Sequence, residues 1–416
     1  METGIPLIDR VQEIYPWYKS EEYKKLEERY GTRVKETLNE LILYPIFQFD
    51  SINDISQTLQ KNKNKYYDLL KDKDVDWWQL IKEISFGLLV TFLKKYRSKK
   101  EKSSKSRWKI RLILDSTIIK RWGRKMAYTF NVYNPTDRCY MHAQKLLFFA
   151  VCVGKDKFIF PLAPTFITSK QHPNHVSPKV QIKQMLLELN NYVHANGLTL
   201  DGVRMVTDSE YSIIEVMKLA KQLGLEFYGA LKSSWVVNID SVDTHVLELK
   251  NGCIPKPPKH SHSIGLYYRL NASHNILGDI ALLIKPYFCP FTRRLKYSVF
   301  LSSNPNVNSN VIHQEHSVRW KIENMFRDFK HVLAIASYHG TYHVAQNASF
   351  AISSLRFIFA RLSLKVAALS PSLRWNIKNT KFTLTKLSRY IRDHYFLDSK
   401  SFKLKRLQYS PLSSVR

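Results

Sequence analysis

One stretch of this chain, VIHQEHSVRWKIENMFRDFKHVL, combines a carboxylate with several cations at helical spacing. At steps of three, four and seven come His316, Arg319, Glu323 and Lys330. A helix turns about 100° per residue, so these side chains share a narrow arc, with Arg327 just beside it. A carboxylate among cations can hold a metal ion and a phosphate together. Exposed helices also carry Glu/Arg pairs for solubility alone, so this stretch leaves both interpretations open.

Two further acids follow apolar runs that are typical of buried strands. Asp115 closes the run RLILD, and Asp208 closes VRMVTD. An unpaired carboxylate at such a place is costly, although strand-end acids also cap loops or pair with lysine. Parallel strands carry sites at their carboxyl ends. We therefore predict that Asp115 and Asp208 are neighbours, with Glu323 brought over that end by its helix.

Three carboxylates of this kind favour one type of chemistry. Hard oxygen ligands suit Mg²⁺ or Mn²⁺ rather than zinc. Two such ions about 4 Å apart activate an attacking oxygen and stabilise a leaving one in phosphoryl transfer. Arg319, Arg327 and Lys330 would then clamp phosphates.

The helices and strands that must position these acids are predicted from the spacing of the hydrophobic residues, which changes from a helical to a strand period along the chain. Residues 140–154 and 157–164 are predicted to pair as antiparallel strands. Ser177-Pro178 opens a helix that stops at Asn196-Gly197. A helix over IIEVMKLAKQLG and a strand at 225–231 follow the second aspartate. This alternation predicts an α/β fold.

The remaining segments suggest the organisation of the chain. Five segments after Ser234 look mostly like strands, namely WVVNI, HVLEL, GLYYRL, GDIALLIKPY and KYSVFLSS. They form a β-rich insertion ahead of the helix that carries Glu323. The predicted units are a helical N-terminal region (1–100), a first core part (101–233), the insertion (234–305), the glutamate helix (306–345) and a helical, basic C-terminal region (346–416).

Residues 49–72 resemble a helix-turn-helix. Asp50 or Ser51 can cap a first helix, and the break KNKNK leads to a second helix that could enter a major groove. The turn lacks the usual glycine, so an ordinary helical hairpin is the alternative. The basic run 94–109 is interpreted as a solvated linker that can also contact phosphates.

The overall charge narrows the class of partner. Sixty-four basic residues stand against 35 acidic ones, for a net charge of +29. That excess favours a polyanion, either nucleic acid or an anionic membrane surface. The longest apolar run, 146–153, is far shorter than the ~20 residues of a membrane span, and no basic, then apolar, signal sequence opens the chain.

Cysteine and histidine usage gives no sign of a zinc site. The four cysteines are widely separated, without CxxC or Cys/His spacing, and read as free thiols in a reducing compartment. His172 and His175 lie in a Pro-rich segment without companion ligands, so an ordinary structural role is the simpler interpretation.

These motifs together resemble the DDE transposases of bacterial and archaeal insertion sequences, in the cut-and-paste branch with a Y-R-E-K signature. That signature has two, three and six residues between its members, and the four residues spaced in this way here are His316, Arg319, Glu323 and Lys330. LDST, VTDSEYS, RWKIENMFRDFK and KYSVFLSSNP also look like the family, and the resemblance covers about residues 107–340. His316 stands where the family usually has a tyrosine that helps bind phosphate near the transposon end.

The resemblance implies an RNase H-like catalytic core interrupted by a β-rich insertion and preceded by a helical DNA-binding domain. Two Mg²⁺ or Mn²⁺ ions would be bound by Asp115, Asp208 and Glu323. Phosphate would be held by Arg319, Lys330 and His316. The reaction would be hydrolysis at the ends of the element, whose released 3′-hydroxyls then attack target DNA.

Further expectations follow from the same resemblance. The partner would be double-stranded DNA, at the element's terminal repeats and at the target, bound by a homodimer in a synaptic complex of the prokaryotic nucleoid. Relatives with the insertion pass through a DNA hairpin and stack a flipped base on an aromatic residue. Trp235 is a candidate for that stacking, with core packing as the alternative.

Two other functions fit the same residues. One is a catalytically silent, transposase-derived DNA-binding protein or repressor. The other is a nuclease of the same fold that cuts DNA without joining it.

Overall fold

The two apolar runs that contain the aspartates become the parallel centre of one sheet. β1 (Ile110–Lys120) pairs in parallel with β6 (Arg204–Thr207), and β6 pairs in parallel with β7 (Glu226–Ala230). On its other side β1 pairs antiparallel with β3 (Cys139–Val153). β1, β6 and β7 are almost wholly buried, which explains why their sequences are continuous apolar runs rather than alternating ones.

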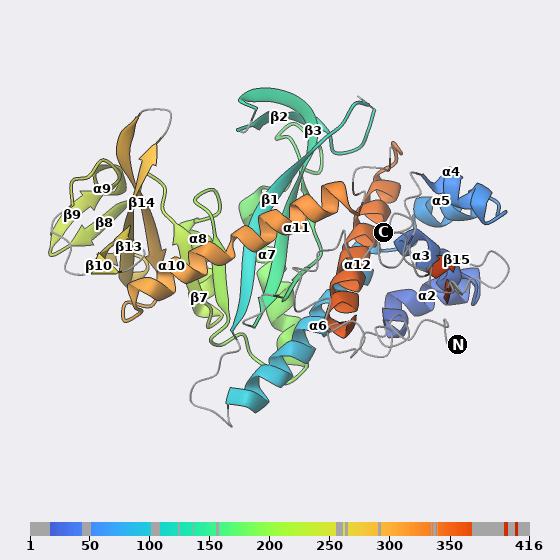
Figure 1. The fold of residues 1–416 in the computed structure, drawn as a ribbon, viewed down its shortest axis with the longest axis horizontal. Helices are drawn as coiled ribbons and strands as arrows, with labels where there is room; N and C mark the ends of the chain where they lie inside the picture. Colours follow the sequence, from blue (N-terminus) through green and yellow to red (C-terminus); the bar gives the residue numbers. More distant parts are fainter. Residues whose placement is uncertain are drawn as a thin grey trace, which may run out of the picture.

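This arrangement comes from a computed structural model of the chain (Figure 1). It describes residues 17–43, 51–100, 109–123, 125–135, 137–154, 158–254, 261–262, 265–289, 293–333, 335, 338, 340–367, 395–397 and 404–406. The N-terminal residues 1–16, residues 101–108 of the basic run 94–109, the KPPKH stretch and most of the basic tail lie outside the described residues.

The sheet is large and mixed. Its strand order is β2-β3-β1-β6-β7-β14-β13-β12-β8-β9, and β4 and β5 also pair with β3. Outside the central four, its strands are β2 (Phe130–Asn134), β4 (Phe158–Pro161), β5 (Thr165–Ile167), β8 (Val236–Ile239), β9 (Val242–His245), β12 (Tyr268–His274), β13 (Gly278–Cys289) and β14 (Arg294–Ser302). Two small separate pairs are β10 (Ser261–His262) with β11 (Gly265–Leu266), and β15 (Tyr395–Leu397) with β16 (Leu404–Arg406).

The β-rich insertion extends the central sheet rather than forming a second one. β14 pairs antiparallel with β7, and β13 and β12 continue outward from it. The predicted strands at WVVNI, GLYYRL, GDIALLIKPY and KYSVFLSS are confirmed, but HVLEL is a short helix, α9 (Val246–Lys250). Val246 and Leu249 are both buried there, and their spacing of three fits one helical turn better than a strand.

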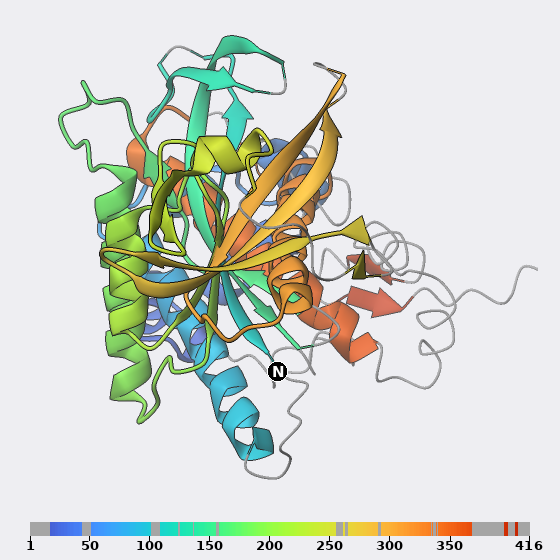
Figure 2. The same cartoon turned by 90° about the vertical axis from the view of Figure 1, so that its left-hand side faces the viewer.

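Helices cover both faces of the sheet. α7 (Pro178–Ala195) and α8 (Ile214–Gln222) lie on one face, and α10 (Ser309–Val318) and α11 (Trp320–His331) cross the other. In Figure 2 the green α7 and the orange α10–α11 lie on opposite sides of the strands. The stretch with the helical spacing of His316, Arg319, Glu323 and Lys330 is therefore helical, in two parts that meet at Arg319 and end at His331. Five of its apolar side chains are buried against the sheet, namely Val318, Ile322, Met325, Phe326 and Phe329.

The remaining helices pack beside the sheet as one body. They are the 3-10 helix η1 (Trp17–Lys19) and the α-helices α2 (Glu21–Tyr30), α3 (Val34–Leu43), α4 (Ile52–Thr58), α5 (Asn64–Lys71), α6 (Trp77–Lys100) and α12 (His343–Ala367). Arg356 on α12 is buried and donates to the backbone carbonyls of Leu41, Ile42 and Leu333. This arginine therefore ties the N-terminal helices to the end of the glutamate helix.

Residues 49–72 contain two short helices, α4 and α5, an arrangement that fits the predicted helix-turn-helix and the alternative helical hairpin equally. Ser51 caps α4, and the apolar side chains of both helices are buried, namely Ile52, Ile55, Leu59, Tyr66, Leu69 and Leu70. Gln60 takes the positive φ of 51° at the turn, where a glycine would be usual. Among the described helices, none is long and apolar enough to span a membrane. The fold is thus mixed α/β around one open sheet.

Candidate active site

Asp115 and Asp208 lie side by side at one edge of the parallel strands. The parallel register pairs Leu114 with Thr207, so the next residue on each chain is the aspartate, on strands about 4.8 Å apart. β1 does not end at Asp115 as predicted; it continues to Lys120 because β3 still pairs with it there. The predicted meeting of the two aspartates is borne out by this register.

The two aspartates differ in their local bonds. Asp115 is 8% exposed, and its Oδ1 accepts the backbone N–H of Ser116 at 2.8 Å. Asp208 is half-buried, and its Oδ1 accepts the backbone N–H groups of Glu210 and Tyr211 at 2.8 and 3.3 Å. Asp208 thus closes the turn that leads into α8. Both of its bonds use the same oxygen, so Oδ2 is not committed within the described part of the chain.

Glu323 reaches the aspartates through Arg319 rather than directly. Nη1 of Arg319 lies 2.9 Å from Oδ2 of Asp115, and Nη2 lies 2.6 Å from Oε1 of Glu323. The guanidinium therefore bridges two of the three predicted acids. Its Nε is buried and has no hydrogen-bond partner among the described residues. This donor is available to an acceptor that enters the site.

The electrostatics of the site show an excess of negative charge. Burial, and then the charge of Asp208, raise the pKa of Asp115 to about 7, although Arg319 acts in the opposite direction. Burial also raises the pKa of Asp208. Tyr211 is fully buried beside them, and its hydroxyl pKa is raised by burial and by nearby carboxylates. The positive charge of Arg319 alone therefore does not compensate for the burial and mutual repulsion of the carboxylates.

This donor set fits a hard divalent cation. Its ligands would be carboxylate oxygens, and the raised pKa of Asp115 is the signature of a buried charge that a cation would relieve. Within the described ranges, no three His, Cys, Asp or Glu side chains converge closely enough to form a ready ligand set. Glu323 would have to exchange its bond to Arg319 for one to the ion.

His316 lies apart from the acids. Its ring rests on Phe300 of β14, with the ring centroids 3.9 Å apart, and it is half-buried. Burial, together with the charges of Arg319, His313 and Lys285, lowers the pKa of His316 to about 4. The imidazole is therefore neutral near pH 7 and offers a phosphate a hydrogen bond but no charge.

Arg327 and Lys330, the cations of α11 that were predicted to clamp phosphates, are exposed and form no ion pair with the acids. Lys330 is two turns beyond Glu323, about 10 Å along the helix axis. Nη2 of Arg327 donates to the side chain of Asn324 at 2.7 Å. Both extend the positive edge of the helix past the acids.

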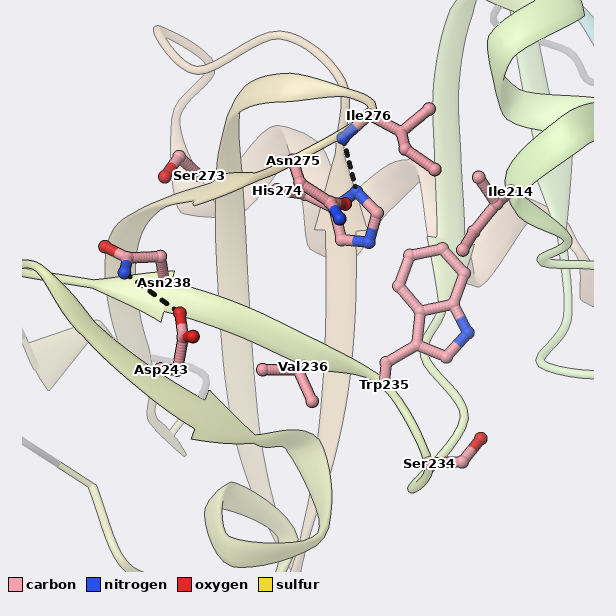
Figure 3. Close-up of a pocket in the computed structure, with 10 residues that line it drawn as sticks. All are labelled: Ile214, Ser234, Trp235, Val236, Asn238, Asp243, Ser273, His274, Asn275 and Ile276. Carbon is pink, nitrogen blue, oxygen red and sulfur yellow. Dashed lines mark hydrogen bonds between the residues drawn. The ribbon is translucent and has the colours of Figure 1, made fainter.

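Trp235 lies on the opposite face of the sheet from Arg319. It is 9% exposed and packs in the core cluster that includes α7 and α8. Figure 3 shows its indole beside Ile214 and the ring of His274, whose centroid is 5.2 Å away, at the wall of a 630 Å³ cavity. Core packing accounts for most of this side chain, and the cavity exposes the rest.

A buried ion-pair network, which the motifs did not reveal, fixes the long helix on the sheet. Glu315 of α10 is fully buried and pairs with Arg111 of β1 and with Arg204 of β6, the latter at 2.6 Å. Arg204 also contacts Glu226 of β7 at 3.0 Å. A signal was present, because each arginine stands four residues before an aspartate in RLILD and RMVTD. That spacing places Arg and Asp on the same face of each strand.

The comparisons with known proteins do not identify a family. No family model matches the sequence, and no curated protein is significantly similar to it. The site therefore has to be interpreted from its own geometry.

Proposed function

We propose that this protein is a metal-dependent DNA transposase of the DDE type, which cleaves the ends of its own insertion sequence and joins them to target DNA. The observation that carries the proposal is the pairing of Asp115 and Asp208 on adjacent parallel strands, with Glu323 linked to Asp115 by Arg319. Two acids from distant strands meet at one sheet edge, and Arg319 links the third to them, in a chain of net charge +29.

The topology supports an RNase H-like core for this proposal. A central β1 with an antiparallel neighbour on one side and parallel β6 and β7 on the other matches the strand arrangement expected for that fold. α10–α11 would be the glutamate helix, and the helical region with α4 and α5 would bind DNA. The expected partner is double-stranded DNA, bound by a homodimer in the prokaryotic nucleoid.

In this proposal Asp115, Asp208 and Glu323 hold two Mg²⁺ or Mn²⁺ ions. When bound, these ions make the attacking oxygen more nucleophilic and stabilise the charge on the leaving one. Arg319 is released from the acids and donates to a phosphate oxygen, for which its unpartnered Nε is already available. Lys330 and Arg327 neutralise phosphates further along the strand, and His316 supplies a neutral hydrogen bond.

A second candidate is a catalytically silent DNA-binding protein derived from such an enzyme. One observation favours it: Arg319 already supplies a positive charge between Asp115 and Glu323, where an ion would otherwise be needed. DNA binding would then depend on the basic surface alone.

The decisive experiment is a cleavage and joining assay. It uses the purified protein, a DNA that carries the element's own ends, and Mg²⁺ or Mn²⁺, with Glu323→Gln beside the wild type. We expect 3′-hydroxyl ends and joined products from the wild type and only background from the variant. Glu188→Gln is the matched control, since that glutamate pairs with Lys82 on α6, remote from the acids.

The other outcomes separate the alternatives. Cleavage without joined products would identify a nuclease. Tight binding of the ends with no cutting in either metal would exclude the enzyme and leave the silent DNA-binding protein.

A further inference from the structure

Two β-hairpins extend past the edge of the sheet where Asp115 and Asp208 lie. One is formed by β2 and β3, the other by β13 and β14, and both point to the top of Figure 1. β14 runs antiparallel to β7, so its first residue lies beyond the carboxyl end of the parallel strands. The hairpins therefore flank the edge that carries the acids.

The register shows which side chains of the hairpins share the face of Asp115. Asp115 pairs with Phe148, whose ring packs against Phe326 of α11. Tyr140 is eight residues from Phe148 on the same strand, so it lies on that face, and Tyr133 is its direct cross-strand partner. Both tyrosines are exposed, by 73% and 49%.

The second hairpin presents cations on the same face. The row of paired residues that contains Asp115 and Asp208 continues through β7 to Phe300, against which His316 of α10 rests. Lys296 and Arg294 are four and six residues from Phe300 on β14 and therefore share its face. Tyr287, 44% exposed, lies directly opposite Lys296.

The spacing of the hairpins suits a particular partner. Five strand intervals separate their midlines, about 24 Å where they leave the sheet. That width is close to the diameter of a DNA duplex. Tyr140 lies about 27 Å beyond the level of Asp115, and Arg294 about 20 Å, measured along the strands. A duplex with one phosphate next to Asp115 and Asp208 would thus pass between the two hairpins, which extend to comparable heights on either side of it.

We propose that the two hairpins form a cradle that holds duplex DNA across the acids. Tyr133 and Tyr140 donate hydroxyl hydrogen bonds to phosphates on one side, and Arg294 and Lys296 neutralise phosphates on the other. The residues from 280 to 302 include four basic residues and no acid, which suits a polyanion. The cradle rests on the proposal that DNA is the substrate, and it assigns the surface that binds the duplex next to the scissile phosphate.

The chain carries its own probes for this cradle. Cys289 is half-buried on β13 directly opposite Arg294, on the face of the cradle. Cys139 is exposed next to Tyr140 and therefore points to the opposite face of β3, so it shows whether protection is confined to the cradle's face. Cys253 is exposed beyond α9 and serves as the internal control. We would follow N-ethylmaleimide labelling of each cysteine by mass spectrometry in EDTA, with and without a saturating random-sequence 30-base-pair duplex.

DNA is expected to slow labelling of Cys289 at least about fivefold, to slow that of Cys139 less, and to leave Cys253 unchanged. Equal rates with and without bound DNA would overturn the cradle. Protection that appears without DNA as the protein concentration rises would also overturn it, because the hairpins would then contact a second copy of the chain.

Two pairs of substitutions test the hairpins separately, by fluorescence anisotropy on the same duplex in EDTA. Tyr133→Ala with Tyr140→Ala should weaken binding about fivefold to thirtyfold, since each of the two lost hydrogen bonds is worth roughly 0.5–1 kcal/mol. Arg294→Gln with Lys296→Gln should lower the slope of log affinity against log salt by about 1.8, which corresponds to two phosphate contacts.

Matched controls lie on the opposite face of the sheet. They are Val180→Ser with Leu187→Ser on α7, both exposed, and Lys183→Gln with Lys218→Gln on α7 and α8. Losses of affinity equal to those of the hairpin variants would overturn the cradle. Because the assay contains no metal, its result is independent of cleavage: protected hairpins in a protein that never cuts would keep the cradle and exclude the enzyme.

Discussion

Arg319 is the residue on which the state of the site depends. It bonds Asp115 and Glu323 at once, and these two bonds hold together acids that would otherwise repel. In the proposed enzyme the same guanidinium has to turn from carboxylates to phosphate when metal and DNA arrive. Its Nε, buried without a partner among the described residues, keeps one donor ready for that exchange.

The raised pKa of Asp115 makes a prediction about stability. Folding raises this pKa to about 7, so the folded state holds the proton more tightly than the unfolded state, and stability falls as pH rises from about 4 to 7. Above pH 7 the Asp115 carboxylate is charged in the folded protein, and the full free-energy cost of burying that charge lowers the stability. Asp115→Asn removes the charge, and we expect it to stabilise the metal-free protein by about 1–2 kcal/mol at pH 8, and scarcely at pH 4.

Urea unfolding in EDTA at the two pH values measures this difference. Adding Mg²⁺ at pH 8 should then raise the stability of the wild type more than that of the variant, because ligand binding to the folded state adds stability. A variant less stable than the wild type at pH 8 in EDTA would contradict the prediction.

At this scale the sequence predicted the acids but not their bonds. The position of each aspartate at the end of an apolar run was enough to place Asp115 beside Asp208, because the register of parallel strands is regular. The link from Glu323 to Asp115 through Arg319 could not be predicted, since side-chain pairing depends on how far the helix sits above the sheet. The same holds for His316, whose place on Phe300 depends on the register of β14.

Among the elements, the helix pair α10–α11 is positioned by charge as well as by its apolar face. Four residues on β1 separate Arg111 from Asp115, a rise of about 13 Å. Eight residues on the helix separate Glu315 from Glu323, about 12 Å. The two spacings nearly match, so pairing at Glu315 favours the position in which Arg319 and Glu323 meet Asp115.

Glu315→Gln should therefore be strongly destabilising. The change leaves Arg111 buried without its carboxylate and leaves Arg204 with Glu226 alone, and removing one partner of a buried pair costs about 3–5 kcal/mol. Denaturant unfolding monitors the loss. Glu215→Gln, which breaks the exposed pair with Lys179 on the surface, is the comparison and should change stability by less than about 1 kcal/mol. Equal effects of the two variants would show that the buried network does not hold the helix.

Sequence patterns predicted most elements correctly and failed where tertiary context decides. HVLEL has strand-forming residues, yet it forms α9 because it must turn between β9 and the next segment while burying Val246 and Leu249. β1 extends past Asp115 because β3 offers a partner that local sequence does not reveal. Arg111 and Arg204 were not singled out, because a cation within an apolar run looks like an interruption of the strand. Their role becomes clear only from the structure, in which both pair with the buried Glu315.

For the whole molecule, the excess of 29 positive charges predicts how it binds polyanions. If DNA occupies the surface between the hairpins, with six to ten phosphates contacted, affinity should fall about 10³- to 10⁵-fold between 50 and 200 mM salt. Anisotropy titrations of a random-sequence duplex at four salt concentrations give the slope. A slope that corresponds to fewer than two phosphate contacts would mean that the positive charge is dispersed and does not form one binding surface.

The α/β class, most strands of the insertion and the N-terminal helices were predictable from period and composition. The C-terminal region, predicted to be helical, begins with α12 but also contains the strand pair β15–β16. That the insertion would extend the central sheet was not predictable, because pairing between β7 and β14 joins residues far apart in the chain. Long-range pairings of this kind are decided by what the complete chain can bury.

The late arrival of β14 also affects the protein while it is being made. Ala230, at the end of β7, precedes Arg294, at the start of β14, by 64 positions. At a synthesis rate of 5–20 residues per second, the outer edge of β7 has no partner for about 3 to 13 seconds. An open edge of this kind recruits other strands, so nascent chains on one messenger are exposed to mutual pairing. The three acids also remain incomplete until Glu323 leaves the ribosome, so the proposed metal site cannot form on a shorter nascent chain.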